Sequence, residues 1–233
     1  MDTIPFAFPG VPSVQCFFTT RMAGNLSAPI LSTDIVAART RLMVQNGFNE
    51  WCEVYQVHGD DIWEAAPQPL DKNPECTGDG LFTNVAGRAL FIKTADCQPI
   101  LLTTKDARAV GAIHVGWRGN RLRFPETAVT EFCRQYSCSP QDVVAVRGPS
   151  LGTGVAEFIH FEKEWSEEFR PWFDASTKTM DLWGLTRYQL MVAGVPARQI
   201  YGLDLCTLSH PDMFFSYRRK DEERQMGCIW IAK

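Results

Sequence analysis

Two histidines and one cysteine offer the clearest chemistry in this sequence. His58 precedes a glycine after an apolar run, Cys97 lies between two apolar runs, and His114 ends a third. Two imidazoles and one thiolate form a borderline-soft ligand set that suits Zn²⁺, and three protein ligands leave a fourth tetrahedral position open for water or substrate. The pattern predicts one catalytic zinc ion, which would keep Cys97 deprotonated and act as a Lewis acid or as a source of hydroxide.

The spacing of these residues leaves other interpretations open. They are too far apart for a zinc finger, and each alone is also typical of a core cysteine or a structural histidine. Cys97 is also a candidate nucleophile, with His114 or His58 as its base. Asp79 and Asp96 are candidate proton carriers, although a carboxylate near a strand end equally caps a turn or orients a zinc-bound histidine. The candidate catalytic residues are therefore Cys97, His114, Asp79 and Asp96.

Five further residues are candidates for binding a substrate or an anion. Arg21 ends a predicted strand and Ser27 lies in the loop that follows, so both can point at a bound anion. Arg118 lies in a turn-rich segment after the third apolar run, and its planar donors suit phosphate. Tyr217 and Arg218 bring an aromatic ring and a cation to a predicted binding cleft.

Short, β-branched apolar runs must position these residues, and they indicate strands. Three of them, at 89–92, 99–103 and 109–113, bracket the candidate ligands. We expect other strands at 14–20, 51–57, 62–66, 142–147, 200–206 and 228–231. Helical spacing with caps indicates helices at 33–47, 127–136, 161–173 and 181–194. Segments 1–12, 22–27, 67–78 and 116–120 are expected to be irregular segments, loops or turns.

Composition limits the classes of function. A chain of 233 residues that is 45 % hydrophobic can bury a large core, and with no clear linker we expect one domain over residues 1–233. A net charge of -4 and the lack of a long basic run argue against a nucleic-acid partner. No apolar run approaches the roughly 20 residues of a membrane span, and residues 1–10 lack a signal-peptide pattern, so we expect a cytoplasmic protein with no membrane partner.

The eight cysteines are scattered and include no CxxC pair. The chain is too long to need disulfide staples, so the spacing indicates neither a redox pair nor a zinc ribbon. We expect most of these cysteines to be small buried apolar residues. The oligomeric state is left open by the sequence.

Several motifs resemble those of one known family. In order they are 56–59 (QVHG), 78–79 (GD), 94–99 (TADCQP), 114–119 (HVGWRG), 148–149 (GP), 181–183 (DLW), 206–207 (CT) and 215–218 (FSYR). Over roughly residues 15–230 the chain is similar to the purine nucleoside phosphorylase family once called polyphenol oxidases or laccase-domain proteins. The pair of motifs around Cys97 and His114 is the most specific part of this resemblance.

The resemblance implies both a fold and an activity. It implies an α+β fold, a single-domain sandwich of mixed β-sheets with flanking helices, and one zinc ion bound by His58, Cys97 and His114. It also implies phosphorolysis of adenosine, inosine and methylthioadenosine, and hydrolytic deamination of adenosine. The expected partners are therefore small molecules, a nucleoside and phosphate. The chain departs from the usual family pattern at Val115, at Ser150 in place of a common cysteine, and between residues 27 and 44, where an asparagine-bearing segment is absent.

Two alternative functions remain at this stage. A cysteine or zinc hydrolase could use the same residues against an amide, such as that of a cell-wall precursor. A non-enzymatic zinc-containing interaction module would need a closed four-ligand site, with His160 or His210 as the fourth ligand, and would use an aromatic surface around Trp165 and Trp172. A phenol oxidase would need redox-active copper and many histidines, whereas this chain has four.

Overall fold

Two mixed β-sheets pack face to face in the computed structural model, which describes residues 1–27 and 32–233. The five-stranded sheet has the order β1 (Thr3–Ala7), β2 (Val14–Thr19), β13 (Gln225–Ile231), β6 (Arg88–Thr94) and β3 (Glu50–Cys52). The six-stranded sheet has the order β12 (Ile200–Gly202), β9 (Val143–Arg147), β7 (Gln98–Thr104), β8 (Val110–Val115), β5 (Gly80–Thr83) and β4 (Ile62–Glu64). Three outer pairs, β3 with β6, β4 with β5 and β12 with β9, are parallel, and the other pairs are antiparallel.

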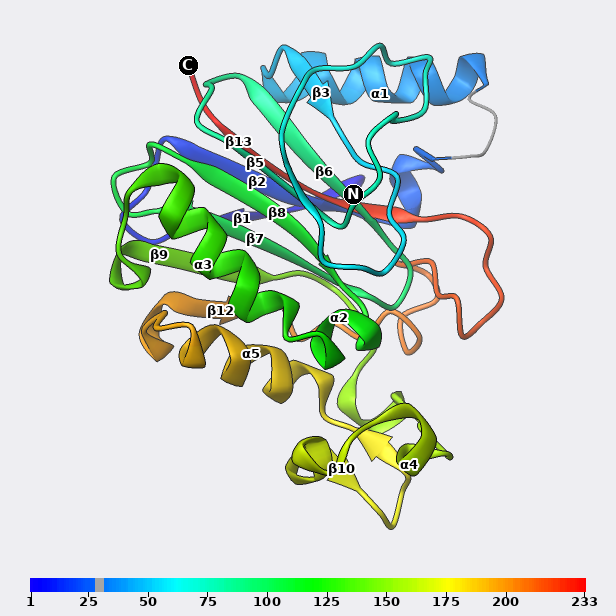
Figure 1. The fold of residues 1–233 in the computed structure, drawn as a ribbon. Coiled ribbons are helices and arrows are strands. Elements are labelled where there is room, and N and C mark those ends of the chain that lie inside the picture. The colour runs from blue at the N-terminus through cyan, green and yellow to red at the C-terminus, as the bar shows by residue number, and fades with distance from the viewer. Residues whose placement is uncertain (28–31) are drawn as a thin grey trace.

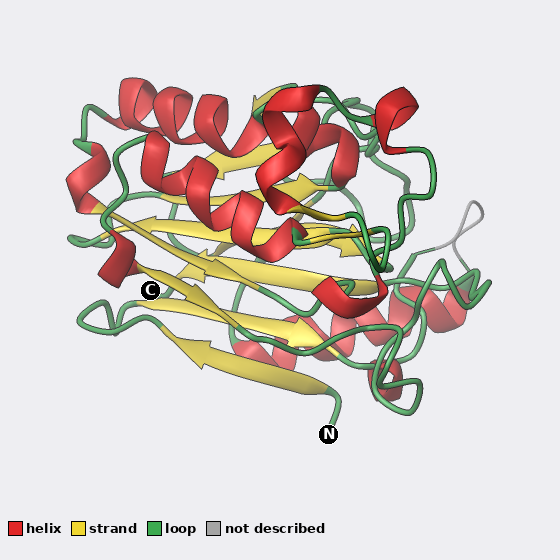
Figure 2. Ribbon diagram, turned by 90° about the horizontal axis from the view of Figure 1, so that it is seen from below, coloured by secondary structure: helices red, strands yellow, loops and turns green. Residues whose placement is uncertain are grey.

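Helices cover the two outer faces of this sandwich. Helix α1 (Thr33–Asn46) lies on the five-stranded sheet, while α3 (Phe124–Tyr136) and α5 (Leu182–Val192) lie on the six-stranded sheet (Figure 1). Figure 2 shows the strands running between these helices. The layers therefore follow the order helix, sheet, sheet, helix, which confirms the predicted α+β sandwich of mixed sheets.

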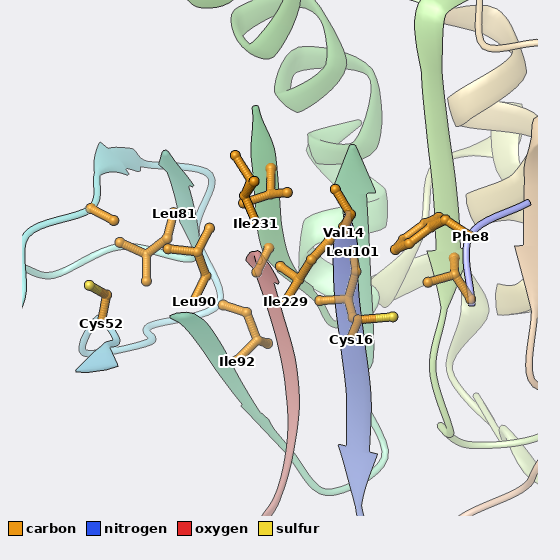
Figure 3. Close-up of a cluster of buried hydrophobic side chains, with 14 of the residues drawn as sticks. Phe8, Val14, Cys16, Cys52, Leu81, Leu90, Ile92, Leu101, Ile229 and Ile231 are labelled. Carbon is orange, nitrogen blue, oxygen red and sulfur yellow. The ribbon is translucent and has the colours of Figure 1, made fainter. Parts of the chain in front are cut away.

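The alternation of side chains along each strand explains why the central runs are apolar throughout. In β6, Leu90 and Ile92 point into the core between the sheets (Figure 3), whereas Phe91 packs beneath α1. In β7, Leu101 faces the same inner core and Leu102 faces the helices α3 and α5. A strand that is covered on both faces needs apolar residues at successive positions, so these runs are continuous.

A smaller apolar cluster extends from one end of the sandwich. It is built by α4 (Phe161–Glu164), the 3₁₀ helix Glu167–Trp172 and the two-stranded ribbon of β10 (Phe173–Asp174) and β11 (Thr179–Met180). We predicted one helix over 161–173, but the segment is divided into two short helices because Trp165 is extended. Of the two tryptophans that the interaction-module hypothesis places on an aromatic surface, Trp165 is buried in this cluster and Trp172 is half-buried.

Several predicted boundaries are wrong. Residues 3–7 form a strand that pairs with β2, and the strands predicted at 51–57 and 200–206 end at Cys52 and Gly202. The predicted turn at 116–120 is mostly the short helix α2 (Trp117–Arg121). The prediction that most cysteines are buried is also wrong: Cys16, Cys52 and Cys228 are buried, Cys76 is exposed and the rest are half-buried, all as free thiols. No helix in the described part of the chain is long and apolar enough to span a membrane.

Candidate metal centre

His58, Cys97 and His114 come together at one end of the sandwich. One possible ligand atom from each lies within 4.8 Å of the others, and the two imidazole centroids are 4.8 Å apart. His58 lies in the loop between β3 and β4, Cys97 in the turn that joins β6 to β7, and His114 in β8. In the described part of the chain this is the only group of three or more such side chains that could hold a metal ion. Neither His160 nor His210 belongs to it, so the proposed fourth protein ligand is not supported.

Strand pairing and one glycine allow this close approach. The register of β7 and β8 sets Gln98 opposite Val115 and Pro99 opposite His114, so the turn with Cys97 lies beside Gly116. A Cβ atom at Gly116 would lie 2.9 Å from Sγ of Cys97 and 3.1 Å from Cδ2 of His58. A side chain at this position would therefore push two candidate ligands apart.

Asp79 organises both histidines. Its buried carboxylate lies 2.7 Å from Nδ1 of His114, and it accepts hydrogen bonds from the backbone N–H groups of Val57, His58 and Gly59. The contact with Nδ1 leaves Nε2 of His114 as the possible ligand atom. The backbone contacts hold the loop that contains His58, a residue with a positive φ of 62°. This geometry matches the orienting role considered for Asp79, since carboxylates commonly fix the tautomer of a metal-binding histidine.

The three side chains are electrostatically coupled. Burial alone would raise the pKa of the Cys97 thiol, but the charge and hydrogen bond of His114, helped by His58, lower this pKa to about 6. Burial alone would lower the pKa of His114, but the Cys97 thiolate and Asp79 raise this pKa to about 9. Burial would also raise the pKa of Asp79, yet the contacts with His114, Gly59 and Val57 lower it below its usual value. The metal-free site therefore favours a thiolate beside an imidazolium at neutral pH.

The donor set fits a zinc ion. With Zn–S near 2.3 Å and Zn–N near 2.1 Å, tetrahedral ligands are about 3.6 Å apart. Because the three ligand atoms lie within 4.8 Å of one another, an ion would have to draw them together by about 1.2 Å at most. The ionised thiol matches what a metal requires of its ligands, and the contact of Nδ1 with Asp79 leaves Nε2 of His114 as the nitrogen that would give up its proton to an ion.

Asp96 anchors a wall of the site. Its side chain accepts hydrogen bonds from the hydroxyls of Thr207 and Ser216 and from the backbone N–H of Arg218, at 2.7, 3.0 and 2.8 Å. The residue has a positive φ of 88°, a conformation that Asp and Asn adopt more readily than most residues. Asp96 thus ties the segment after β12 to the turn that carries Cys97. A role in proton transfer stays a prediction.

A cavity of about 710 Å³ opens over the three candidate ligands. Four of the five predicted substrate residues line it, namely Ser27, Arg118, Tyr217 and Arg218. Arg118, Tyr217 and Arg218 are exposed at its mouth. Other residues, which were not predicted as site residues, also line it: Tyr55, Gln56, Lys93, Thr94, Trp117, Leu151, Phe158, Glu164, Leu182 and Arg224. Lys93 had a detectable signal, because a lysine interrupts an otherwise apolar strand.

Arg21 is not among the lining residues. Its Nη2 donates to the carboxylate of Asp221 at 2.8 Å and to the carbonyl oxygen of Phe214, and its guanidinium stacks on Phe215 at 4.3 Å. A guanidinium held by its own carboxylate and facing an aromatic ring is poorly placed to bind phosphate. These contacts suit a structural role, and the phosphate-binding role of Arg21 stays a prediction.

Fold and site together define a two-sheet sandwich protein with a group of three side chains that could hold a metal ion beneath an open cavity. The family model described as multi-copper polyphenol oxidoreductase laccase matches residues 16–232. The chain belongs to this family, which confirms the resemblance found in the sequence.

Relatives and solved structures agree with this assignment. A purine nucleoside phosphorylase of Xylella fastidiosa is 36 % identical over 193 residues, covering 76 % of this chain and 70 % of that protein. The human purine nucleoside phosphorylase LACC1 is 30 % identical over 242 residues, covering 93 % of this chain and 55 % of that protein. The crystal structure of YlmD from Geobacillus stearothermophilus has a TM-score of 0.86 at 26 % identity, covering 100 % of this chain and 97 % of that one.

Proposed function

We propose that this protein is a zinc-dependent purine nucleoside phosphorylase that also deaminates adenosine. The observation that carries the proposal is the meeting of His58, Cys97 and His114 at the base of a cavity large enough for a nucleoside. Relatives named as purine nucleoside phosphorylases support the choice of substrate class. Adenosine, inosine and methylthioadenosine are the proposed nucleosides.

The cavity has chemically distinct parts that suit the two substrates. Trp117, Phe158 and Leu182 form an apolar wall on which a purine base can pack. Arg118 and Arg218 bring cations to the mouth, where an anion enters. This division supports a reaction between an uncharged nucleoside and phosphate.

The residues around the ligands have clear tasks in this proposal. A zinc ion held by the three ligands would supply a Lewis acid and would lower the pKa of a bound water. Asp79 holds Nδ1 of His114, so that Nε2 is the nitrogen left for the ion, and it fixes the loop of His58. Asp96 holds the segment with Tyr217 and Arg218 in place over the site, so that phosphate and nucleoside meet in a fixed orientation.

A second function is favoured by one observation. A thiolate at Cys97 paired with an imidazolium at His114 is also the state of a nucleophilic cysteine, so a cysteine hydrolase acting on an amide is the second candidate. Metal dependence separates the two candidates. A chelator abolishes zinc-dependent activity, whereas it leaves a cysteine nucleophile free to react.

The test is to measure the zinc content of the purified protein and incubate it with adenosine, with and without phosphate. Adenine, ribose 1-phosphate and inosine are then quantified separately by chromatography. We expect adenine and ribose 1-phosphate only when phosphate is present, and inosine in both cases. Both activities should disappear after chelation and return when zinc is added.

Substitutions test whether the activity depends on the candidate ligands. Cys97→Ala and His114→Ala should lose every product, while Cys76→Ala and His160→Ala, which change exposed residues of the same types outside the site, should retain wild-type rates. Thermal unfolding of each variant verifies that it is folded. Normal product formation by folded Cys97→Ala or by zinc-free protein would refute the proposal.

A further inference from the structure

Lys93 is a largely enclosed cation that lines the cavity. It lies in β6 beside Thr94, and its side chain is only 16 % exposed. Gln56 fixes its backbone, because the side-chain amide of Gln56 accepts from the N–H of Lys93 and donates to its carbonyl oxygen, each at 2.8 Å. The backbone of Lys93 is therefore tied to Gln56, which lies two positions before His58 in the chain.

A buried ion-pair cluster surrounds the Lys93 ammonium. Glu53, with a fully buried side chain, lies between two cations: Nη2 of Arg39 is 2.8 Å from its Oε1, and Nζ of Lys93 is 3.2 Å from its Oε2. The side-chain amide of Gln68 also donates to Oε1 at 3.2 Å. Neither cation forms another ion pair with any residue that the structure describes. Two positive charges thus share one negative charge, and the cluster has a surplus of one positive charge.

The Arg39 end of the cluster has no capacity for a ligand. Its Nε and Nη2 donate to the carbonyl oxygen of Leu26, its Nη1 donates to that of Leu70, and its guanidinium packs over Trp51. The whole residue is inaccessible to solvent. The surplus charge can therefore meet an incoming ion only at the Lys93 end.

The Lys93 ammonium still has donors to offer. Oε2 of Glu53 accepts no hydrogen bond within the described residues, so its 3.2 Å contact with Nζ is an ion pair without hydrogen-bond alignment. Nζ donates no hydrogen bond elsewhere in residues 1–27 and 32–233. An ammonium that is largely removed from water and lacks aligned acceptors gains strongly from an anion with several oxygens.

We propose that Lys93 is the anion-binding group of the cavity, and that inorganic phosphate binds to its ammonium while Glu53 and Arg39 hold it in place. The other cations on the lining are less suited. Arg118 is exposed and lies over the ring of Trp117. Arg218 is exposed and donates to the carbonyl oxygen of Glu157, and Arg224 donates to three carbonyl oxygens of its own turn. A charge in a partly buried position interacts more strongly with an anion than one that water screens. The inference rests on the proposed function only for the identity of the anion.

Calorimetric titration of inorganic phosphate into the zinc-loaded protein tests this inference directly. Lys93→Met removes the charge and leaves the neutral pair of Arg39 and Glu53, so it should raise the Kd for phosphate about tenfold or more. Lys93→Arg should restore most of the affinity. Lys105→Met, which removes an exposed lysine outside the cavity, should bind phosphate as the wild type does. Phosphate affinity in Lys93→Met within twofold of wild type would overturn the inference.

Kinetics separate this inference from the proposed function. If phosphorolysis occurs, Lys93→Met should raise the KM for phosphate at least tenfold and leave the KM for adenosine and the rate of inosine formation within about twofold. A protein without phosphorylase activity that still binds phosphate through Lys93 would refute the function and retain the anion site. A loss of thermal stability in Lys93→Met with an unchanged phosphate KM would show that Lys93 only balances Glu53.

A measurement on the wild-type protein covers the case in which the variant does not fold. Reductive methylation of lysines, mapped by mass spectrometry, is compared with and without saturating phosphate. We expect phosphate to slow the modification of Lys93 several-fold and to leave that of Lys105 unchanged. Equal modification of Lys93 in both conditions would contradict the inference.

Discussion

Replacement of Asp79 by asparagine tests the central geometry of the site, because all four of its partners are nitrogen atoms that donate or can donate hydrogen bonds. Asparagine keeps one carbonyl oxygen and gains an NH₂ group, which must then face at least one of these partners. If it faces Nδ1 of His114, that nitrogen becomes an acceptor and the proton moves to Nε2. The imidazole then has the wrong tautomer to bind a metal through Nε2.

The size of the effect follows from these contacts. Carboxylates that orient a metal-binding histidine typically contribute 10- to 100-fold to metal affinity, or roughly 1.4 to 2.7 kcal/mol. The metal-free protein should also lose stability, since each hydrogen bond to a buried charged group contributes about 1.5–3 kcal/mol and at least one is lost. A loss of about 3 kcal/mol lowers the Tm by roughly 6–12 °C for a chain of this size.

Competition with a chromogenic chelator measures the zinc affinity of Asp79→Asn, and thermal unfolding of the metal-free protein measures its stability. Asp60→Asn is the matched control, because it removes one negative charge from an exposed residue of the same loop. Zinc affinity within threefold of wild type would refute the orienting role. A large fall in kcat at saturating zinc with unchanged zinc affinity would instead indicate that Asp79 transfers protons.

Three further predictions follow from the same site. Gly116→Ala should weaken zinc binding at least tenfold in chelator competition, because its Cβ would lie 2.9 Å from the Cys97 sulfur; unaltered affinity would contradict this reasoning. Asp96→Asn, which tolerates the positive φ, should speed proteolysis of the segment it anchors and reduce kcat/KM while zinc affinity stays within about threefold. In zinc-free protein the alkylation rate of Cys97 should rise as the pH increases through about 6, where its thiol ionises, whereas Cys16, with a pKa of about 12, should not react; peptide mapping checks both, and zinc should protect Cys97.

Local patterns predicted much of the fold. The bounds predicted for α1 agree with the structure within one residue, and Gly47 ends the helix in the left-handed conformation as expected. The cap is Ser32, which accepts from the N–H of Ile35, and not Thr33 or Asp34 as the sequence suggested. The short helix α2 was missed because five residues carry no helical period. It forms because Asn120 is buried and hydrogen-bonds to Thr186 and Gln189 of α5, which the local sequence does not reveal.

The sequence by itself determined the chemistry of the candidate centre, because two histidines and a cysteine in distinctive motifs define a ligand set whatever surrounds them. Only the tertiary structure decided which charged side chains serve that centre. Arg21 pairs with Asp221 from the far end of the chain, while Lys93 enters the cavity from inside a buried strand. The reason is physical: the partner and the solvent exposure of a charge depend on contacts between residues distant in sequence, whereas the kind of ligand atom depends on the residue alone.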